Sequence, residues 1–207
     1  MIYEYLSENY DKGEPIFLTD INIEGMSEDN LRYHMKKLTD DGMIERFDSG
    51  IYYIPNTDVF GRKKQLSPEA VAVAKYISRK GNRVGFFSGY TLANRMGFST
   101  QVPFVEEITS NYAPAPLREI SIKNRRYILR RPVVKVNEEN VHVLQFLDCL
   151  KDIEKTAEVG ADECGNILTE FAREKRITKD RIDKYIDYYP LKIYKSIYDT
   201  GVRYVSA

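Results

Sequence analysis

The chain of 207 residues is predicted to have an α+β fold in two domains. The first is a winged helix-turn-helix over residues 1–60, because this stretch has the order helix, helix, helix and two-stranded hairpin. The second spans residues 61–207 and combines a small antiparallel sheet with several helices, because strand-like segments there precede a run of amphipathic helices. The basic connector 61–65 marks the boundary between the two domains.

Local start and stop signals define the elements of the first domain. The predicted helices are residues 2–10, 19–25 and 27–42, and the hairpin pairs 43–47 with 51–54. Ser27 caps the third helix, and acidic residues in its first turn are favoured there by the helix dipole. Gly42 ends this helix, as glycine commonly does. The hairpin turns at 48–50, and Pro55 stops its second strand.

The third helix is the candidate recognition helix. Its apolar residues Leu31, Met35 and Leu38 recur at i, i+4 and i+7, which indicates that this face packs on a core. In a winged helix such a helix enters the major groove of DNA, and the hairpin touches the adjacent backbone. Arg32 can read guanine or bind phosphate. The predicted DNA-binding residues on helix and hairpin are Ser27, Arg32, Tyr33, Lys36, Lys37, Arg46, Ser49 and Gly50.

Charge is strongly segregated along a chain whose net charge is zero. Residues 1–58 contain five Lys/Arg against 13 Asp/Glu, residues 59–136 contain 15 against 4, and residues 137–207 contain 11 against 14. The basic middle segment suggests an anionic partner. The acidic first segment is unusual for a DNA-binding domain, because phosphate contacts supply most non-specific affinity. A winged-helix adaptor that binds protein and not DNA therefore stays open as the alternative.

The second domain is predicted to alternate short strands with helices before ending in helices alone. Its first helix opens at Ser67-Pro68 and runs to Gly81. Strands follow at 84–87 and 104–109, and a hairpin pairs 119–123 with 126–130 about a turn at Asn124-Arg125. The remaining helices are predicted at residues 89–96, 137–152, 161–174, 178–188 and 190–200.

A second nucleic-acid surface is suggested by basic residues of the connector and of the predicted hairpin. They are Arg62, Lys63, Lys64, Lys123, Arg125, Arg126, Arg130 and Arg131. On the hairpin these cations are interleaved with Tyr127, and a basic stripe with an aromatic suits a nucleic-acid backbone. A solvated edge hairpin, whose charges prevent strand-to-strand aggregation, explains the same pattern equally well.

Two stretches carry a resemblance to a known family. Residues 84–103 contain a glycine, a helix that ends at Met96-Gly97, and then Thr100-Gln-Val-Pro103, while residues 27–55 contain the candidate recognition helix and hairpin. Both resemble AbiEi-like antitoxins of bacterial type IV toxin–antitoxin systems, and the likeness extends less specifically to about residue 150. We expect the segment Thr100–Pro103 to be a turn that closes the domain's core, because it has no nucleophile, acid or metal ligand.

The resemblance implies a function as well as a fold. It implies a transcriptional repressor of its own operon, in which the winged helix binds inverted repeats of double-stranded promoter DNA. It also implies an antitoxin with a role in phage resistance. Its functional partner would be a nucleotidyltransferase-type toxin, without a stable complex being required.

Several classes of protein are disfavoured by the sequence. A glycine-rich phosphate loop, metal-ligand spacing and a nucleophile elbow are all missing, so we expect a protein that is not an enzyme and has no cofactor or metal. No apolar run is long enough to span a bilayer and the N-terminus does not resemble a signal peptide, which predicts a cytoplasmic protein. Tyrosines 185, 188, 189, 194, 198 and 204 crowd the C-terminal helices, as core residues or as a homodimer or toxin contact.

Overall fold

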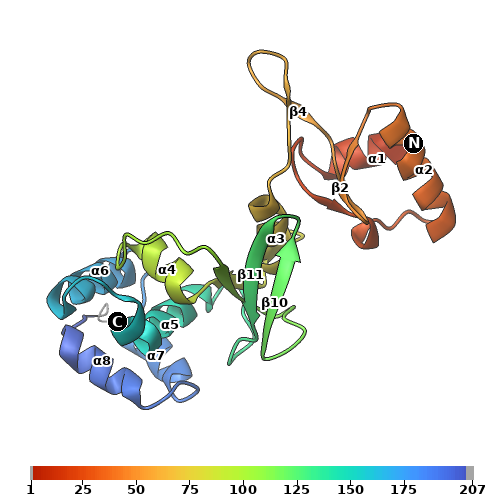
Figure 1. Ribbon diagram of the computed structural model, residues 1–207. Coiled ribbons are helices and arrows are strands. Elements are labelled where there is room, and N and C mark those ends of the chain that lie inside the picture. The colour runs from red at the N-terminus through yellow and green to blue at the C-terminus, as the bar shows by residue number, and fades with distance from the viewer. Residues whose placement is uncertain (1, 204–207) are drawn as a thin grey trace. The chain divides into compact units, whose positions relative to one another are not determined.

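The computed structural model describes residues 2–203, so Tyr204 of the predicted tyrosine cluster lies outside the described residues (Figure 1). The chain forms two compact units, Met1–Val71 and Ala72–Ala207. The fold is mixed α+β, as predicted, with eight α-helices among the described residues. None of the helices in 2–203 is both long and apolar enough to cross a membrane.

The first unit places two helices beside a small sheet (Figure 1). Its elements are α1 (Ile2–Asn9), β1 (Ile16–Phe17), the 3-10 turn η1 (Leu18–Asp20), α2 (Glu28–Asp40), β2 (Glu45–Asp48), β3 (Ile51–Tyr53), β4 (Asn56–Thr57) and β5 (Lys63–Lys64). The sheet has the order β1-β3-β2, and both pairings are antiparallel. β4 and β5 form a separate antiparallel pair.

The predicted core of this unit is confirmed. Leu31 and Met35 of α2 are buried together with Leu6 of α1 and Ile16 of β1, so α2 turns its apolar stripe inward. The predicted cap also forms, because the Ser27 hydroxyl accepts a hydrogen bond of 3.3 Å from the backbone N–H of Asn30.

The predicted second helix, 19–25, is wrong. The chain makes only the three-residue turn η1 and is already extended at Ile21 (φ −81°, ψ 122°). Two β-branched isoleucines at 21 and 23 disfavour a helix, and Gly25 adopts a left-handed φ of 76°. A segment this short cannot offset the cost of helix nucleation.

The second unit packs helices around one mixed sheet. Its elements are α3 (Pro68–Tyr76, which begins in the first unit), β6 (Ser78–Arg79), β7 (Asn82–Arg83), β8 (Gly85–Phe87), α4 (Gly89–Met96), β9 (Glu106–Ser110), β10 (Leu117–Ile122), β11 (Arg125–Arg130), α5 (Val141–Thr156), α6 (Ala161–Glu174), α7 (Lys179–Ile186) and α8 (Lys192–Thr200). The sheet order is β10-β11-β9-β8. The β10/β11 and β8/β9 pairs are antiparallel as predicted, whereas β11 runs parallel to β9, which the sequence did not indicate.

Two predicted boundaries, the end of α3 and the turn of the later hairpin, are misplaced. α3 ends at Tyr76 and not at Gly81, and residues 78–83 form a hairpin. Lys80 (φ 50°) and Gly81 (φ 75°) are its two turn residues, and two positive φ angles are typical of a tight hairpin turn. The later hairpin turns at Lys123 and Asn124, one residue before the predicted position, since Ile122 pairs with Arg125.

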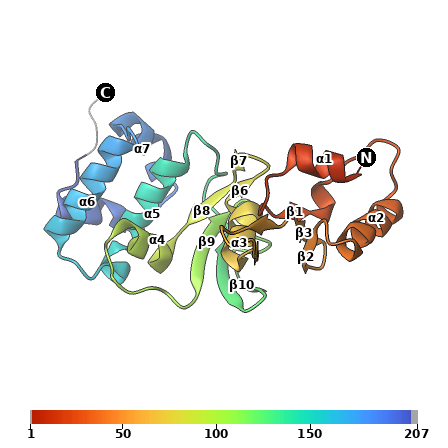
Figure 2. The same cartoon turned by 90° about the horizontal axis from the view of Figure 1, so that it is seen from above.

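Helix α5 is the centre of the second unit and contacts α4, α6, α7 and α8 (Figure 2). Its residues Leu144, Phe146, Leu147 and Leu150 are almost completely buried. The helix begins at Val141 and not at 137, because Asn137 and Asn140 exchange side-chain-to-backbone hydrogen bonds of 2.8 and 3.0 Å ahead of it. The predicted span of α6, 161–174, is confirmed.

Candidate nucleic-acid interface

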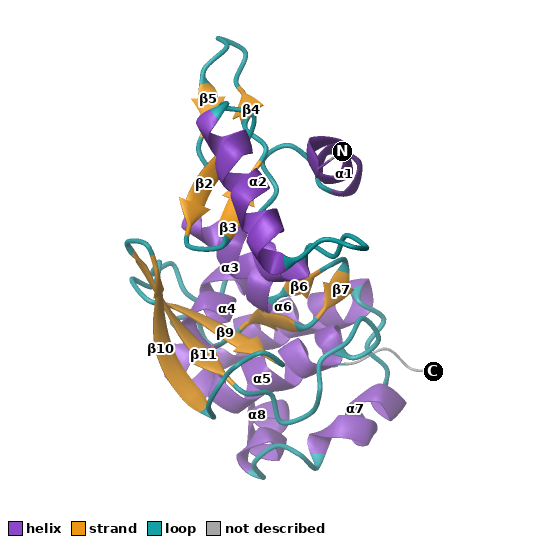
Figure 3. Ribbon diagram, turned by 90° about the vertical axis from the view of Figure 1, so that its right-hand side faces the viewer, coloured by secondary structure: helices purple, strands orange, loops and turns teal. Residues whose placement is uncertain are grey.

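Helix α2 exposes the face that was predicted to bind DNA. Ser27, Arg32, Tyr33, Lys36 and Lys37 are all exposed, and the Tyr33 side chain reaches 64% exposure. The exposure follows directly from the burial of Leu31 and Met35, because residues one or two positions away from a buried stripe point outward on a helix. Figure 3 shows α2 as a continuous helix beside strands β2 and β3.

Acidic residues surround Arg32 on α2. Its guanidinium lies 3.1 Å from Glu28 Oε2 and 3.7 Å from Asp29 Oδ1. All three side chains are well exposed, so each ion pair contributes only about 0–1 kcal/mol. Such pairs can be exchanged for a phosphate or a base edge at little cost. The two pairs hold the Arg32 side chain over the first turn of the helix.

The acids and bases of α2 occupy different turns. Glu28 and Asp29 lie in the first turn, and Asp40 ends the helix. The cations Arg32, Lys36 and Lys37 lie between these ends. The exposed face is therefore positive in its middle and negative at both ends, although the first unit as a whole contains eight Lys/Arg against 14 Asp/Glu.

The β2–β3 hairpin carries the other predicted contacts. Arg46 is exposed, and its Nε donates to the Asp48 carbonyl at 3.3 Å. The turn is well ordered by local bonds: the Ser49 N–H donates to Asp48 Oδ1 at 2.7 Å, and the Gly50 carbonyl accepts from the Leu18 N–H at 2.8 Å. Gly50 adopts a left-handed φ of 70°. The turn that holds Ser49 and Gly50 is thus fixed to η1.

The predicted second basic surface is divided between the two units. Arg62, Lys63 and Lys64 lie in the first unit, on and beside β5, whereas the remaining five cations lie in the second. Two of these five cations form ion pairs of 3.1 Å: Arg125 pairs with the buried Glu106, and Arg126 forms an exposed pair with Glu119.

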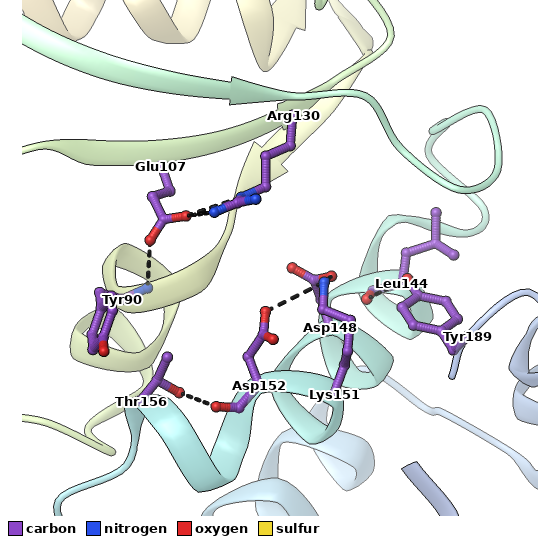
Figure 4. A network of polar contacts seen from close by, with 9 residues as sticks. All are labelled: Tyr90, Glu107, Arg130, Leu144, Asp148, Lys151, Asp152, Thr156 and Tyr189. Atoms are coloured by element: carbon purple, nitrogen blue, oxygen red, sulfur yellow. Dashed lines mark hydrogen bonds and ion pairs between the residues drawn. The ribbon is translucent and has the colours of Figure 1, made fainter. Parts of the chain in front are cut away.

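Arg130 is occupied by a structural ion pair. Its Nε and Nη2 donate to Glu107 Oε2 at 3.0 and 2.7 Å, and Glu107 Oε1 accepts from the Tyr90 N–H at 3.2 Å (Figure 4). The Glu107 side chain is only 8% exposed. Because breaking such a pair leaves a buried charge uncompensated, Arg130 links β11 to β9 and α4 and is poorly suited to bind phosphate.

A second buried polar group lies nearby on α5. Asp148 and Lys151 form an ion pair, and Asp152 Oδ2 lies 3.3 Å from the same Lys151 nitrogen (Figure 4). Burial raises the pKa of Asp148, although Lys151 opposes the shift. Tyr189, in the connection between α7 and α8, attaches this connection to α5 by donating to the Leu144 carbonyl at 3.2 Å. This network connects elements of the core, and within residues 2–203 no three His, Cys, Asp or Glu side chains are grouped as metal ligands.

Tyr127 does not contribute to a basic surface, contrary to the prediction. Its side chain is completely buried, because alternate residues of β11 point to opposite faces and Tyr127 and Leu129 point into the protein. The exposed aromatic near this hairpin is Phe104, which is 80% exposed and lies 5.1 Å from the Arg126 guanidinium.

The segment Thr100–Pro103 does not close the core, contrary to the prediction. Gln101 is exposed and the Val102 side chain is 81% exposed. Glu158 holds the start of this loop by accepting from the Thr100 N–H at 2.8 Å. Hydrogen bonds from the Thr100 backbone and the Ser99 side chain lower the pKa of Glu158.

One exposed feature of the first unit was not predicted from the sequence. Val59 and Phe60, at the end of the β4–β5 hairpin, are 94% and 78% exposed. The signals were present in Asp58, a residue that favours turns, and in Gly61, which adopts a left-handed φ of 76°. The basic residues after them instead suggested a connector.

Comparison with known families gives one match. A family model described as a family of unknown function (DUF6088) matches residues 2–176, which include all the described strands and helices α1 to α6. Helices α7 and α8 lie beyond the matched range. No curated protein matches the chain.

Proposed function

Because the chain belongs to the DUF6088 family, whose function is unknown, we propose a function from its structure: it is a transcriptional regulator that binds double-stranded DNA. Helix α2 enters the major groove, and the β2–β3 hairpin contacts the adjacent phosphates. Arg32 reads a base edge, while Tyr33, Lys36 and Lys37 bind backbone. The mechanism is binding alone, with no bond made or broken.

One observation carries this proposal. The middle of α2 presents an exposed, cationic face while its apolar face is buried, and a hairpin with an ordered Ser49-Gly50 turn follows it directly in the chain. If α2 were the only feature, its exposed charged residues could be explained as an ordinary solvated surface. The combination with an adjoining hairpin of defined geometry favours a groove-binding unit.

The order of elements supports a winged helix-turn-helix in a reduced form. Helix α1, strand β1, turn η1, helix α2 and the β2–β3 hairpin follow one another, and β1 adds to the hairpin as a third strand. In this proposal η1 and the segment to Gly25 take the place of the second helix. The bond from the Leu18 N–H to the Gly50 carbonyl then joins that segment to the wing.

The regulator proposal has a direct test in sequence preference. A duplex from the region upstream of the chain's own gene should bind about a thousandfold more tightly than an unrelated duplex of equal length at physiological salt. Anisotropy titrations of both duplexes measure the ratio. Equal, salt-insensitive binding of the two duplexes would refute regulation. Absence of duplex binding together with capture of a basic protein would instead establish the adaptor.

The resemblance to AbiEi-like antitoxins extends the proposal to a biological role. We propose that the chain represses its own operon and counteracts a nucleotidyltransferase-type toxin encoded beside it. Co-expression with the neighbouring open reading frame should restore growth that this reading frame alone arrests. A variant of α2 that no longer binds DNA should lose repression of the operon but still restore growth, because rescue need not use the DNA-binding face.

A further inference from the structure

We propose that the β4–β5 hairpin is a second DNA-contacting element, which inserts Val59 and Phe60 into the minor groove of the duplex bound by α2. The inference rests on the proposed function and adds a contact that neither α2 nor the β2–β3 hairpin supplies. The proposed partner of the β4–β5 hairpin is double-stranded DNA. The hairpin would bind it through two apolar side chains at the tip and basic residues beside them.

The apolar tip is unusually exposed. Val59 is 94% and Phe60 is 78% exposed, more than any other large apolar side chain of the first unit. Two adjacent apolar side chains in water have no stabilising role in the unit itself. The loop between β4 and β5 extends away from the sheet of the first unit (Figures 1 and 3). The sheet and helices of the first unit therefore do not cover this loop.

The loop is built to hold these side chains outward. Asp58 Oδ1 accepts from the N–H groups of Phe60 and Arg62, each at 2.9 Å, and Asp58 Oδ2 accepts from Arg62 Nε at 2.9 Å. The Asp58 N–H and carbonyl also bond to Arg62 and Gly61 across the loop. With its backbone fixed in this way, the loop loses little conformational entropy when the tip is inserted into a partner.

Charge selects nucleic acid as the partner. Residues 58–64 contain Arg62, Lys63 and Lys64 against Asp58 alone, whereas residues 1–57 contain five Lys/Arg against 12 Asp/Glu. The hairpin is thus the basic segment of an acidic unit. The Arg62 side chain is 75% exposed, so its ion pair with Asp58 can be exchanged for a phosphate, and Lys64 is exposed as well.

The apolar side chains of the tip favour the minor groove as its binding site. Valine and phenylalanine cannot hydrogen-bond to phosphates, so their burial requires contact with sugars, thymine methyl groups or the faces of bases. Proteins that bind the minor groove frequently insert such apolar wedges between base steps, with cations on the flanking phosphates. The Arg62 guanidinium lies 5.3 Å from the Phe60 ring and can follow it toward the groove.

The root of the hairpin is attached to the ribbon that carries the wing. Lys63 Nζ lies 3.1 Å from Glu45 Oε1, and Tyr53 donates its hydroxyl to the same carboxylate. The Tyr53 hydrogen bond lowers the pKa of Glu45, and burial together with Glu45 raises the pKa of Tyr53 to about 12. Glu45 pairs with Tyr53 at one end of the ribbon, and Asp48 pairs with Ile51 at the other, beside the Ser49-Gly50 turn. The β4–β5 hairpin and the Ser49-Gly50 turn thus lie at opposite ends of the β2–β3 ribbon.

The test is a double substitution, Val59→Ser with Phe60→Ser, in the full chain. Binding to the chain's own upstream duplex should weaken about tenfold or more, because two apolar side chains lose their burial. The thermal midpoint should not change, since both side chains are exposed in the folded protein. A minor-groove-binding drug should compete with wild-type protein and should have much less effect on the residual binding of the variant.

A matched control is Leu191→Ser, which removes an equally exposed apolar side chain (82%) from the second unit and should leave binding unchanged. Retention of wild-type affinity by the Val59/Phe60 variant overturns this inference and leaves the proposed function intact. If wild-type protein binds no duplex, the proposed function fails as well. Loss of binding to a protein partner with unchanged duplex affinity would assign the tip to that partner and also overturn the inference.

Discussion

Replacing Arg32, Lys36 and Lys37 together by alanine is expected to weaken duplex binding about a hundredfold at physiological salt. Each lost phosphate contact should also reduce the slope of log Kd against log salt by about one unit, because fewer counterions are released. Anisotropy titrations at several salt concentrations measure both quantities. Arg32→Ala alone should chiefly reduce the preference for the upstream duplex over an unrelated one.

The matched control removes the same charge from another exposed helical surface. Lys184, Lys192 and Lys195 on α7 and α8 are exposed and lie in the second unit. Their replacement by alanine should change affinity only slightly. Equal loss in both triple variants would mean that net charge alone drives binding, and it would contradict the role given to the face of α2.

Gly165→Ala is expected to lower the free energy of unfolding by about 3 kcal/mol. A Cβ atom at Gly165 on α6 would lie 1.9 Å from the Thr200 carbonyl oxygen of α8, and that oxygen belongs to backbone that cannot rotate away. The two helices must therefore separate, which would loosen the core around α5. Urea unfolding measures the effect as a shift of the midpoint.

Gly160→Ala is the control for this prediction. Gly160 precedes the same helix with an ordinary φ of −67°, and no atom lies within 4 Å of a Cβ built there. This variant should lose no more than about 1 kcal/mol, the cost of placing alanine at the N-cap of α6. A Gly165→Ala protein as stable as the Gly160→Ala protein would show that α6 and α8 do not approach as closely as described.

The sequence predicted those elements that local signals define. The Ser27 cap, the end of α4 at Gly97 and the span of α6 depend on neighbouring residues, and the structure contains all three. Gly25 and Gly81 misled the prediction, because a left-handed glycine can belong to a hairpin or loop as readily as to a helix end. Only pairing across the chain, as in the 78–83 hairpin, decides between these uses.

The candidate site was also predictable only where local sequence signals define it. The exposed face of α2 follows from its apolar stripe, and the structure confirms its exposure. The ion pair between Arg130 and Glu107 depends on the parallel pairing of β9 with β11, which joins residues 23 positions apart and leaves no local signal. The β4–β5 tip was missed because basic residues next to a glycine are equally typical of a linker.

The central claim is that the face of α2 around Arg32, Tyr33, Lys36 and Lys37 fits a double helix despite the acidic residues at its two ends. Its most direct test is titration of the wild-type chain into a short labelled duplex at low ionic strength, where screening is weakest. The account predicts saturable association with both upstream and unrelated duplexes, and steep weakening as salt is added. No association with either duplex under these conditions would contradict it.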